Sequence, residues 1–430
     1  MGSTVDGLVS GLSTSSMISQ LMQIEAAPQN RLKTKVSGAE SMVTSYQSVN
    51  TKLAALKTAS EDLAKPATWR SIKPTSSSTS VTAAATPNAA ATQTGSLTFD
   101  VKQLAKAQIS TARVDSDADL APGGSITISF DDGSDPVTID LTDQPRNAQG
   151  ISDAINGAGL SVKASVVKTS TGDSVLQMTA AKTGVAGSFT VGGLDADLKT
   201  AAVAQDAMLQ VGGADEDGGY TVTSSTNTFT DLMTGVTLTA TKEENNVTIG
   251  VTSDIGGMTD KIKAMVDAAN AVISEVTKQT KYDATTKSGA ALSSEFMVRQ
   301  ISQSVMSAVS QGQADIGSLS KLGVQLEKDG TLTFAKEAFE ASYAADPDKI
   351  KNAGMGMADT FKAVSQKQTA NITNAITGRK SFIDSMNAQI DHWDVRLDQR
   401  REALTKQYAS LETALSNLKS QSSYLSSQLG

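Results

Sequence analysis

The sequence predicts a multidomain α+β protein in which long amphipathic, coiled-coil-like helices from both termini form a leg and a mainly β head is inserted between them. Three patterns carry this prediction. Leucines recur every seven residues near the C-terminus, apolar residues step by threes and fours over residues 29–63, and apolar and polar residues alternate between about 95 and 255. We expect five segments: an N-terminal helical leg (1–65), a Ser/Thr/Ala-rich connector (66–94), the β head (95–255), a helical leg domain with a small hairpin (256–378) and a C-terminal coiled-coil helix (379–430).

The C-terminal pattern predicts one continuous helix from about Arg379 to Leu429. Six apolar residues lie one heptad apart: Ile390, Leu397, Leu404, Leu411, Leu418 and Leu425. No proline or glycine occurs between Gly378 and Gly430, so nothing in the sequence breaks this helix, which would be roughly 70–75 Å long. Alternate core positions hold Arg400, Gln407 and Gln421. The seam is therefore under-filled for a stable coiled coil, and we expect it to need partner helices; the alternative is an amphipathic helix lying on its own globular core.

The N-terminal pattern predicts a short amphipathic helix, an interruption at Pro28, and a second helix over residues 29–63. With long amphipathic helices at both ends of the chain, the economical arrangement is antiparallel pairing of the two. The side chains expected to make partner or oligomer contacts are those of the helical seams: Leu12, Leu21, Met22, Ile390, Trp393, Leu397, Leu404, Tyr408, Leu411, Leu415, Leu418, Leu425 and Leu429.

The predicted head is built from short strands joined by glycine-rich turns. Runs such as residues 126–130 and 137–141 alternate in period two around an Asp131–Ser134 hairpin connection, and a short helix is expected near Ile151–Ile155. The head could form two small domains. The connector before it could contain one strand.

Residues 95–255 carry 21 acidic and 9 basic residues. With this acidic balance, and with no basic patch that has interleaved aromatic residues, nucleic acid is not an expected partner.

Catalytic and metal chemistry are sparsely represented. Cysteine is absent and His392 is the single histidine, so neither a thiolate site nor a Ser-His-Asp arrangement can be assembled. Residues 115–119 (DSDAD) begin like a calcium loop, but Leu120 and Ile126 occupy the positions that need glycine and glutamate. Residues 215–218 (DEDG) are typical of an acidic turn. We expect no enzyme activity, no metal and no cofactor.

The N-terminus lacks a secretory signal pattern, because no basic residue precedes Arg31 and the apolar runs are short. No stretch is long and apolar enough for a transmembrane helix, so membrane insertion is not expected. A route of export without a cleaved leader is the expectation if the protein leaves the cell.

Several short motifs then point to one family. They are residues 9–14 (VSGLST), 21–25 (LMQIE) with Pro28, 101–108 (VKQLAKAQ), Ile155-Asn156, 230–238 (TDLMTGVTL), 322–324 (LGV), 329–332 (DGTL), Asp346-Pro347, and Arg396, Arg400, Gln407-Tyr408, Leu411-Glu412 and 422–425 (SSYL). In this order they resemble the motifs of flagellar filament-capping proteins, the FliD family, also called hook-associated protein 2. Ser13 stands in place of the usual aspartate and Tyr408 in place of the usual phenylalanine.

The resemblance implies a secreted, extracellular protein at the distal tip of the bacterial flagellum, exported by the flagellar type III pathway. It implies a homo-oligomeric ring that promotes flagellin folding and polymerisation and prevents leakage of flagellin, with flagellin, a hook-associated junction protein and an export chaperone as partners. Two alternatives stay open. One is a hook–filament junction protein, and the other is a surface adhesin that uses the β head.

Overall fold

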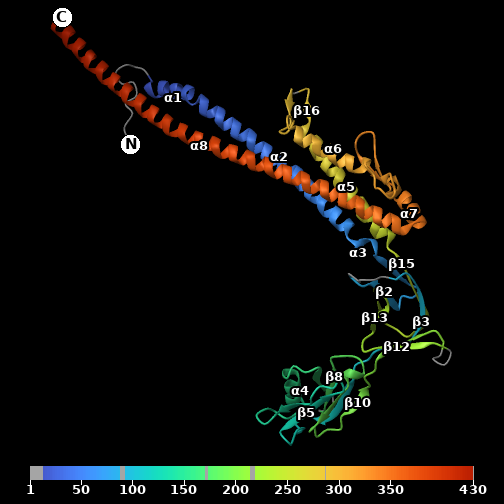
Figure 1. Ribbon diagram of the computed structural model, residues 1–430. Coiled ribbons are helices and arrows are strands. Elements are labelled where there is room, and N and C mark those ends of the chain that lie inside the picture. The colour runs from blue at the N-terminus through green and yellow to red at the C-terminus, as the bar shows by residue number, and fades with distance from the viewer. Residues whose placement is uncertain (1–12, 88–92, 170–172, 214–217, 286, 430) are drawn as a thin grey trace. The chain divides into compact units, whose positions relative to one another are not determined.

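The computed structural model describes residues 13–87, 93–169, 173–213, 218–285 and 287–429, and Figure 1 shows its helices and strands. The chain divides into two compact units. Residues 1–65 and 259–430 form the helical unit, and Pro66–Met258 form the β unit. Each unit is therefore described by itself.

The helical unit is dominated by two long helices. Its elements are α1 (Thr14–Glu25), α2 (Ala27–Ala64), α5 (Ile255–Thr280), α6 (Phe296–Ser310), the 3-10 turn η3 (Leu319–Leu322), α7 (Lys336–Ala345), α8 (Pro347–Leu429), and the hairpins β16 (Tyr282–Asp283) with β17 (Ser288–Gly289) and β18 (Val324–Leu326) with β19 (Leu332–Phe334). Helix α2 lies along α8 (Figure 1). The direction is antiparallel, because Gln29 at the start of α2 bonds Ile390 whereas Tyr46, further along α2, interacts with Arg379. The predicted pairing of the terminal helices is confirmed.

Helix α8 begins much earlier than the predicted start near residue 379. Asp346 caps its first turn by accepting a hydrogen bond from the Lys349 main-chain N–H at 3.1 Å, and Pro347 occupies the first helical position, where no N–H is needed. Glycines that would weaken an isolated helix lie inside it. One of them, Gly356, lets the side chain of Gln313 approach, since a Cβ there would lie 2.6 Å from Gln313 Oε1. Packing therefore holds a helix that local propensity does not favour.

The junction of α1 and α2 differs from the prediction in detail. Pro28 does not separate two distant helices; it lies in the first turn of α2, which starts at Ala27. One residue, Ala26, separates the two helices and adopts right-handed helical φ and ψ angles.

The β unit is made of antiparallel sheets with two separate hydrophobic cores. Its elements are α3 (Pro66–Trp69), β1 (Ile72–Ser76), β2 (Val81–Ala85), β3 (Gly95–Gln103), β4 (Ile109–Asp115), β5 (Ser125–Phe130), β6 (Val137–Asp140), α4 (Ala148–Gly157), β7 (Val162–Lys168), β8 (Asp173–Ala180), the 3-10 turn η1 (Val185–Gly187), β9 (Phe189–Gly192), β10 (Lys199–Ala202), β11 (Ala207–Val211), β12 (Tyr220–Ser224), β13 (Thr228–Met233), β14 (Val236–Ala240) and β15 (Glu244–Ser253).

The first core lies between a five-stranded sheet, β1-β15-β3-β11-β12, and a three-stranded sheet, β13-β14-β2. The second core lies between β10-β4-β8-β7, β6-β5-β9 and helix α4. Phe99 and Phe229 belong to the first core, and Ile128 and Ile151 belong to the second. The alternation of buried and exposed residues along strands such as β8 is the period-two pattern that the sequence shows.

The segment predicted as a connector contains two strands rather than one. Strand β1 pairs with β15 over Ile72–Ser76, and β2 pairs with β14 over Val81–Ala85. Their Ser, Thr and Ala residues do not form the alternation of large apolar and polar side chains by which a strand is predicted from sequence. Pairing partners more than 150 residues away supply the hydrogen bonds that make these segments strands.

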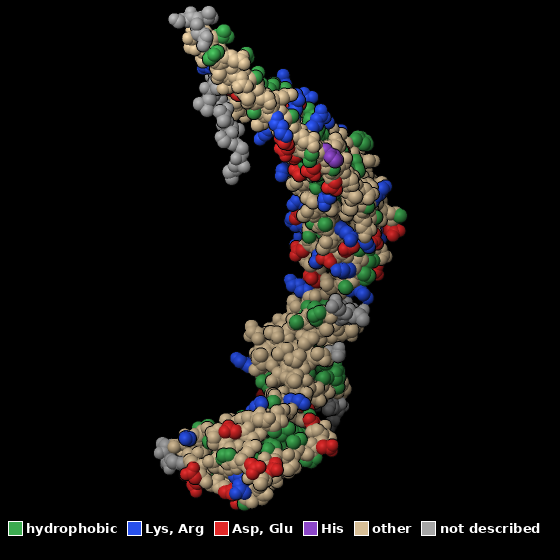
Figure 2. Space-filling model, turned by 90° about the vertical axis from the view of Figure 1, so that its left-hand side faces the viewer, with side chains coloured by type: hydrophobic (Ala, Val, Ile, Leu, Met, Phe, Trp, Pro, Cys, Tyr) green, Lys and Arg blue, Asp and Glu red, His purple; other side chains and the backbone are tan. Residues whose placement is uncertain are grey.

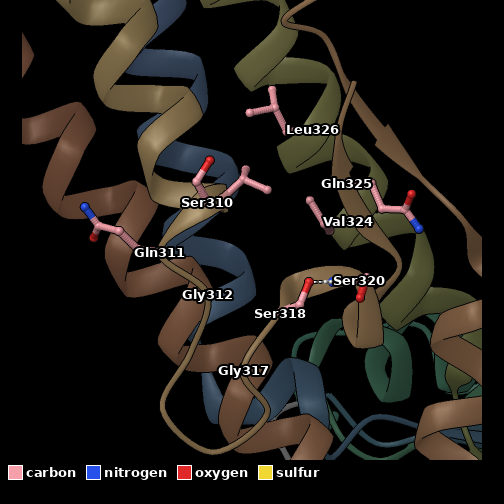
Figure 3. Close-up of a pocket in the computed structure, with 10 residues that line it drawn as sticks. Ser310, Gln311, Gly312, Gly317, Ser318, Ser320, Val324, Gln325 and Leu326 are labelled. Atoms are coloured by element: carbon pink, nitrogen blue, oxygen red, sulfur yellow. Dashed lines mark hydrogen bonds between the residues drawn. The ribbon is translucent and has the colours of Figure 1, made fainter. Parts of the chain in front are cut away.

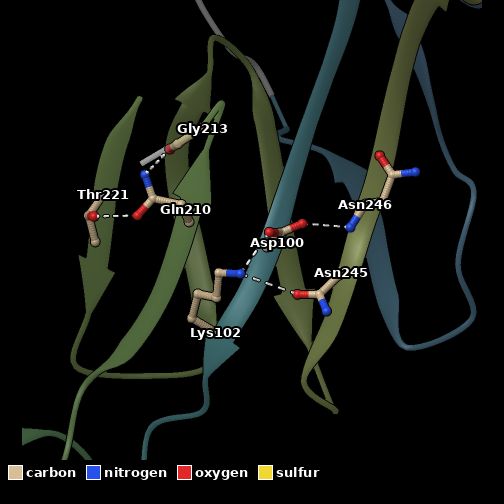
Figure 4. A network of polar contacts seen from close by, with 7 residues as sticks. All are labelled: Asp100, Lys102, Gln210, Gly213, Thr221, Asn245 and Asn246. Carbon is tan, nitrogen blue, oxygen red and sulfur yellow. Dashed lines mark hydrogen bonds and ion pairs between the residues drawn. The ribbon is translucent and has the colours of Figure 1, made fainter. Parts of the chain in front are cut away.

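A polar network covers part of the five-stranded sheet (Figure 4). The Lys102 ammonium bonds the Asp100 carboxylate at 2.8 Å, and the Asn246 main-chain N–H donates to the same carboxylate at 2.7 Å. These two contacts, the Lys102 contact first, lower the pKa of Asp100. Asn246 has a φ of 60°, at an irregularity in the pairing of β15 with β3. The network fixes this bulge.

Side-chain amides stand in for missing strand partners at four places. Each bonds both main-chain groups of one residue, at 2.7–3.2 Å: Asn156 with Ala164, Asn227 with Ala105, Asn270 with Leu332, and Gln108 with Phe189. An amide side chain carries one acceptor and a donor group, as a strand residue does. Gln108 and Asn156 lie in motifs that carry the family resemblance, so these motif residues hold the fold of the β unit together.

Candidate functional site

The seam of α8, the side that carries the heptad leucines, changes from buried to exposed along the helix. Ile390 and Leu404 are 8% and 7% exposed. Leu411, Leu418 and Leu425 are 48%, 61% and 58% exposed. Helix α1 and the first turns of α2 lie against the earlier part of the seam. The last heptads therefore present leucines that the described residues do not bury.

The structure places the other predicted contact residues in three groups. Met22 is buried, Leu21 is exposed on α1, and four residues of α8 are half-buried: Trp393, Leu397, Tyr408 and Leu415. Leu12 lies outside the described residues. Leu429 ends α8, and its side chain also lies outside the described part of the chain.

Polar contacts that the heptad pattern did not predict fix the register of the paired helices. Gln29 is 3% exposed, and its amide donates to the Ile390 carbonyl oxygen at 3.4 Å and to Asp394 Oδ1. Arg400 Nε lies 3.2 Å from Glu25 Oε1 at the end of α1. The signal for the second pair was present in the sequence as Arg400 at a core position of the seam. Its partner, 375 residues away, could not be read from the sequence.

A second polar cluster joins α2, α6 and α8. Arg379 Nη2 lies 2.8 Å from Glu295 Oε1, and the Tyr46 hydroxyl hydrogen-bonds to Glu295. Tyr46 is 1% exposed. Its burial, and then its hydrogen bond to the Glu295 carboxylate, raise the pKa of Tyr46 to about 12. The neutral phenol is the form that the folded helical unit stabilises.

This shift predicts a pH dependence at alkaline pH. Because the unfolded tyrosine ionises near 10, the stabilisation is complete below pH 10 and is lost as the pH rises through 12, by about 2–3 kcal/mol. At pH 8, Tyr46→Phe should be less stable than the wild type by about 1 kcal/mol through the lost hydrogen bond. Urea unfolding at pH 8, 10 and 11.5 measures both chains. The difference in the free energy of unfolding between the wild type and Tyr46→Phe should shrink and then change sign as the pH rises. A difference that stays constant with pH would contradict a raised pKa of Tyr46 in the folded chain.

The charge pattern of the surface changes along α8. Figure 2 shows Lys, Arg, Asp and Glu side chains intermingled over much of the helical unit and fewer of them toward the end of α8. Between residues 407 and 429, Glu412 and Lys419 are the charged residues. The exposed end of the seam is thus a nearly uncharged surface of leucine, serine and glutamine, which suits helix packing more than ionic recognition.

A pocket of about 550 Å³ lies in the helical unit between the end of α6 and β18. Ser310 and Gly312 lie on one side, Val324 and Leu326 on the other, and Ser318 with Ser320 near the loop below (Figure 3). All ten lining residues are uncharged: Val309, Ser310, Gln311, Gly312, Gly317, Ser318, Ser320, Val324, Gln325 and Leu326. This pocket offers no acid or base for catalysis.

A second pocket of about 420 Å³ in the β unit is lined by Arg113, Asp115, Asp173 and Asp195 among others. Within the described ranges, no group of three acidic or histidine side chains is arranged to hold a metal ion. Among the described helices, none has the length and apolar character needed to cross a bilayer.

The described residues combine antiparallel terminal helices, a β insertion and an exposed leucine stripe at the end of α8, an arrangement typical of a structural protein. Comparison with known families agrees. Residues 204–420 match the family model of the flagellar hook-associated protein 2 C-terminus, and residues 10–108 match that of its N-terminus. The chain belongs to the flagellar hook-associated protein 2 family, a family of structural, non-enzymatic flagellar proteins.

Two relatives are distant in sequence but cover almost all of this chain. The flagellar hook-associated protein 2 of Escherichia coli (strain K12) is 26% identical, over 98% of this chain and 97% of that protein. The A-type flagellar hook-associated protein 2 of Pseudomonas aeruginosa is 26% identical, over 96% and 95%. The crystal structure of the D1-D2-D3 domains of the flagellar cap protein FliD from Escherichia coli matches with a TM-score of 0.62 at 24% identity, covering 78% of this chain and 99% of that chain. The similarity to this crystal structure supports the fold of the present chain.

Proposed function

We propose that this protein forms a homo-oligomeric cap at the distal, extracellular tip of the bacterial flagellum. There it promotes the folding and polymerisation of flagellin and prevents unpolymerised flagellin from leaking away. The observation that carries the proposal is the exposed end of the α8 seam, at Leu411, Leu418 and Leu425. A large apolar stripe on a projecting helix marks a surface that a partner covers.

The polar residues of the seam supply a mechanism. Arg400, Gln407 and Gln421 occupy core positions where leucine would bind most tightly. Helix packing on such a seam is weak enough to be exchanged each time a new flagellin subunit arrives. The contact residues in this proposal are the seam residues predicted from the sequence, and the three exposed leucines meet flagellin or a neighbouring cap subunit.

The predicted segments keep their roles in this proposal with one change. The leg comprises residues 1–65, 256–378 and 379–430, and the head comprises residues 95–255 together with residues 66–94, which were predicted as a connector and whose strands pair into the sheets of the β unit. A junction protein of the hook and an export chaperone are the further partners. Family membership favours the cap over the hook–filament junction.

Removing residues 411–430 tests the proposal. These residues include the exposed leucines and the half-buried Leu415 and leave Ile390 and Leu404 in place, so the truncated chain should still fold, with a small loss of stability. Cells that express it should release monomeric flagellin into the medium and bear few filaments. Full-length filaments with no released flagellin would contradict the proposal.

A second deletion separates capping from adhesion. Cells whose chain lacks the β unit, residues 66–258, should retain part of their filament assembly, because the proposed flagellin contacts lie on the leg. Filament length is measured by electron microscopy and attachment to surfaces by a binding assay with equal numbers of cells. Normal filaments with lost attachment would favour the adhesin.

A further inference from the structure

The end of helix α4 carries the one Asn-Gly pair of the sequence, Asn156-Gly157. The Asn156 side-chain amide donates to the Ala164 carbonyl oxygen at 2.7 Å, and its oxygen accepts from the Ala164 main-chain N–H at 3.1 Å. Ala164 lies in β7, an edge strand of its sheet. The asparagine therefore takes the place of a further strand at this edge and joins the end of α4 to it.

An asparagine that precedes glycine has a reactivity of its own. The main-chain nitrogen of the glycine attacks the side-chain carbonyl carbon of the asparagine. A new C–N bond closes a five-membered succinimide, the bond to the side-chain nitrogen breaks, and ammonia leaves. The proton of the attacking nitrogen passes to hydroxide or water, and a second water opens the ring to aspartate or isoaspartate. Glycine favours the attack because it has no Cβ to hinder the approach of its nitrogen.

The fold does not require glycine at position 157. Gly157 is the last residue of α4 and has a helical conformation. A Cβ built on it would have no heavy atom of another part of the fold within 4 Å. Within a helix, glycine is less favourable than alanine. What glycine adds at this position is a reactive neighbour for Asn156.

The folded β unit keeps the two reacting atoms apart. The main chain is helical through Gly157, and the Ala158 N–H still donates to the Ala154 carbonyl oxygen at 2.9 Å. In a helix the N–H groups point along the axis, whereas the side chains point outward. The polar atoms of the Asn156 side chain are also held by Ala164. The attack therefore needs the end of α4 to unwind and to leave β7. Water reaches the site once it opens, because Asn156 and Gly157 are exposed.

We propose that Asn156-Gly157 is a deamidation site, which the docking of α4 on β7 keeps closed, and that reaction there loosens α4 irreversibly. A carboxylate at position 156 has no N–H to donate to the Ala164 carbonyl oxygen, and its negative oxygen faces that carbonyl. Isoaspartate also lengthens the main chain at the helix end. Helix α4 supplies Ile151 and Ile155 to the second core of the β unit, so this core is the part that the reaction weakens.

Peptide mass spectrometry of the purified full-length chain tests the site. The chain is kept at pH 8 and 37 °C, either folded or in guanidinium chloride, and the conversion of each asparagine is followed with time. Asn227 and Asn270 are internal controls, because they make the same kind of side-chain bridge. They precede threonine and alanine instead of glycine.

In denaturant, Asn156 should react at least about tenfold faster than either control. In the folded chain, Asn156 should react at least about 30-fold more slowly than in denaturant, since only the locally opened chain reacts. Equal rates for Asn156 in the two conditions would overturn the closed site. Equal rates for the three asparagines in denaturant would overturn the role of Gly157.

Two variants test the consequence for α4. Gly157→Ala keeps the asparagine and has room for its Cβ, so it should fold like the wild type and deamidate at least about tenfold more slowly in denaturant. Asn156→Asp carries the product from the start. Hydrogen exchange over residues 148–168 should be about tenfold faster in Asn156→Asp than in the wild type, and no faster in Gly157→Ala.

A wild-type sample that has partly deamidated in the folded state gives the same comparison for a chain that folded with its amide in place. Its deamidated fraction should show the faster exchange of Asn156→Asp over residues 148–168. The same exchange in deamidated and intact chains would overturn the loosening of α4. These measurements use the purified chain and do not depend on the proposed capping function, which is scored by flagellin release.

Discussion

Alanine at Leu411, Leu418 and Leu425 together is expected to leave the unfolding temperature of the purified chain within about 5 °C of the wild type and to abolish filament growth. Substitutions at exposed positions change stability by about 0.5 kcal/mol or less, and these side chains are 48–61% exposed. If a partner buries them, each leucine contributes about 1.5–3 kcal/mol to the complex. Three together would weaken the complex by several orders of magnitude. Circular dichroism measures unfolding, and immunoblots of the medium measure released flagellin.

Leu404→Ala is the matched control for this triple variant. Its side chain lies in the same seam but is 7% exposed, so truncation should destabilise the folded chain by about 2–3 kcal/mol. The opposite pattern, with a stable Leu404→Ala chain and an unstable triple variant, would show that the chain buries the far end of the seam rather than Leu404. Normal filaments in cells with the triple variant would show that the exposed leucines of the seam are not needed for the proposed capping function.

Phe361→Ala is expected to give the largest loss of stability, about 3–5 kcal/mol, and to confine it to the helical unit. Phe361 lies on α8 and is fully buried. Removing a buried aromatic ring loses its transfer free energy and leaves a cavity that the packed helices cannot close. Denaturant unfolding followed at the helical signal near 222 nm measures the shift.

Ile128→Ala provides the complementary variant in the β unit. Ile128 is fully buried in the core formed by β5 and its neighbours, so its loss should shift the unfolding of that unit and spare the helical signal. Proteolysis of each variant identifies the unit that opens. If both variants shift both transitions equally, the two compact units unfold as one, and their separate cores do not make them thermodynamically independent.

The periodic parts of the chain are those that the sequence predicted well. The stepping apolar residues of α2 pack against α8, and the heptad leucines form one stripe along α8, because a side chain's place on a helix follows directly from its spacing. Alternation located strands such as β5, β7 and β8 for the same reason. The Asp346-Pro347 and Asp329-Gly330 motifs mark a helix start and a hairpin turn because their chemistry acts on neighbouring residues: Asp346 caps α8, and Asp329 bonds Thr331 across the turn.

Features that depend on distant partners were decided by the tertiary structure. Strands β1 and β2 have ordinary Ser, Thr and Ala sequences and exist because β15 and β14 supply their hydrogen bonds. Helix α8 continues through Gly354, Gly356 and Gly378 because packing on one face outweighs the low helix propensity of glycine.

The α8 seam shows most clearly which features the sequence determined and which the tertiary structure determined. By itself the sequence determined that the leucines of α8 form one stripe, since heptad spacing is a local property. Only the tertiary structure decided which of them are used within the chain. Helix α1 lies along α8 with Glu25 paired to Arg400, and within the described part of the chain Leu404 is buried while Leu411, Leu418 and Leu425 stay exposed. The physical reason is that the spacing of residues along a helix determines on which face of the helix their side chains lie. Whether that face is buried depends on which distant segment of the chain packs against it.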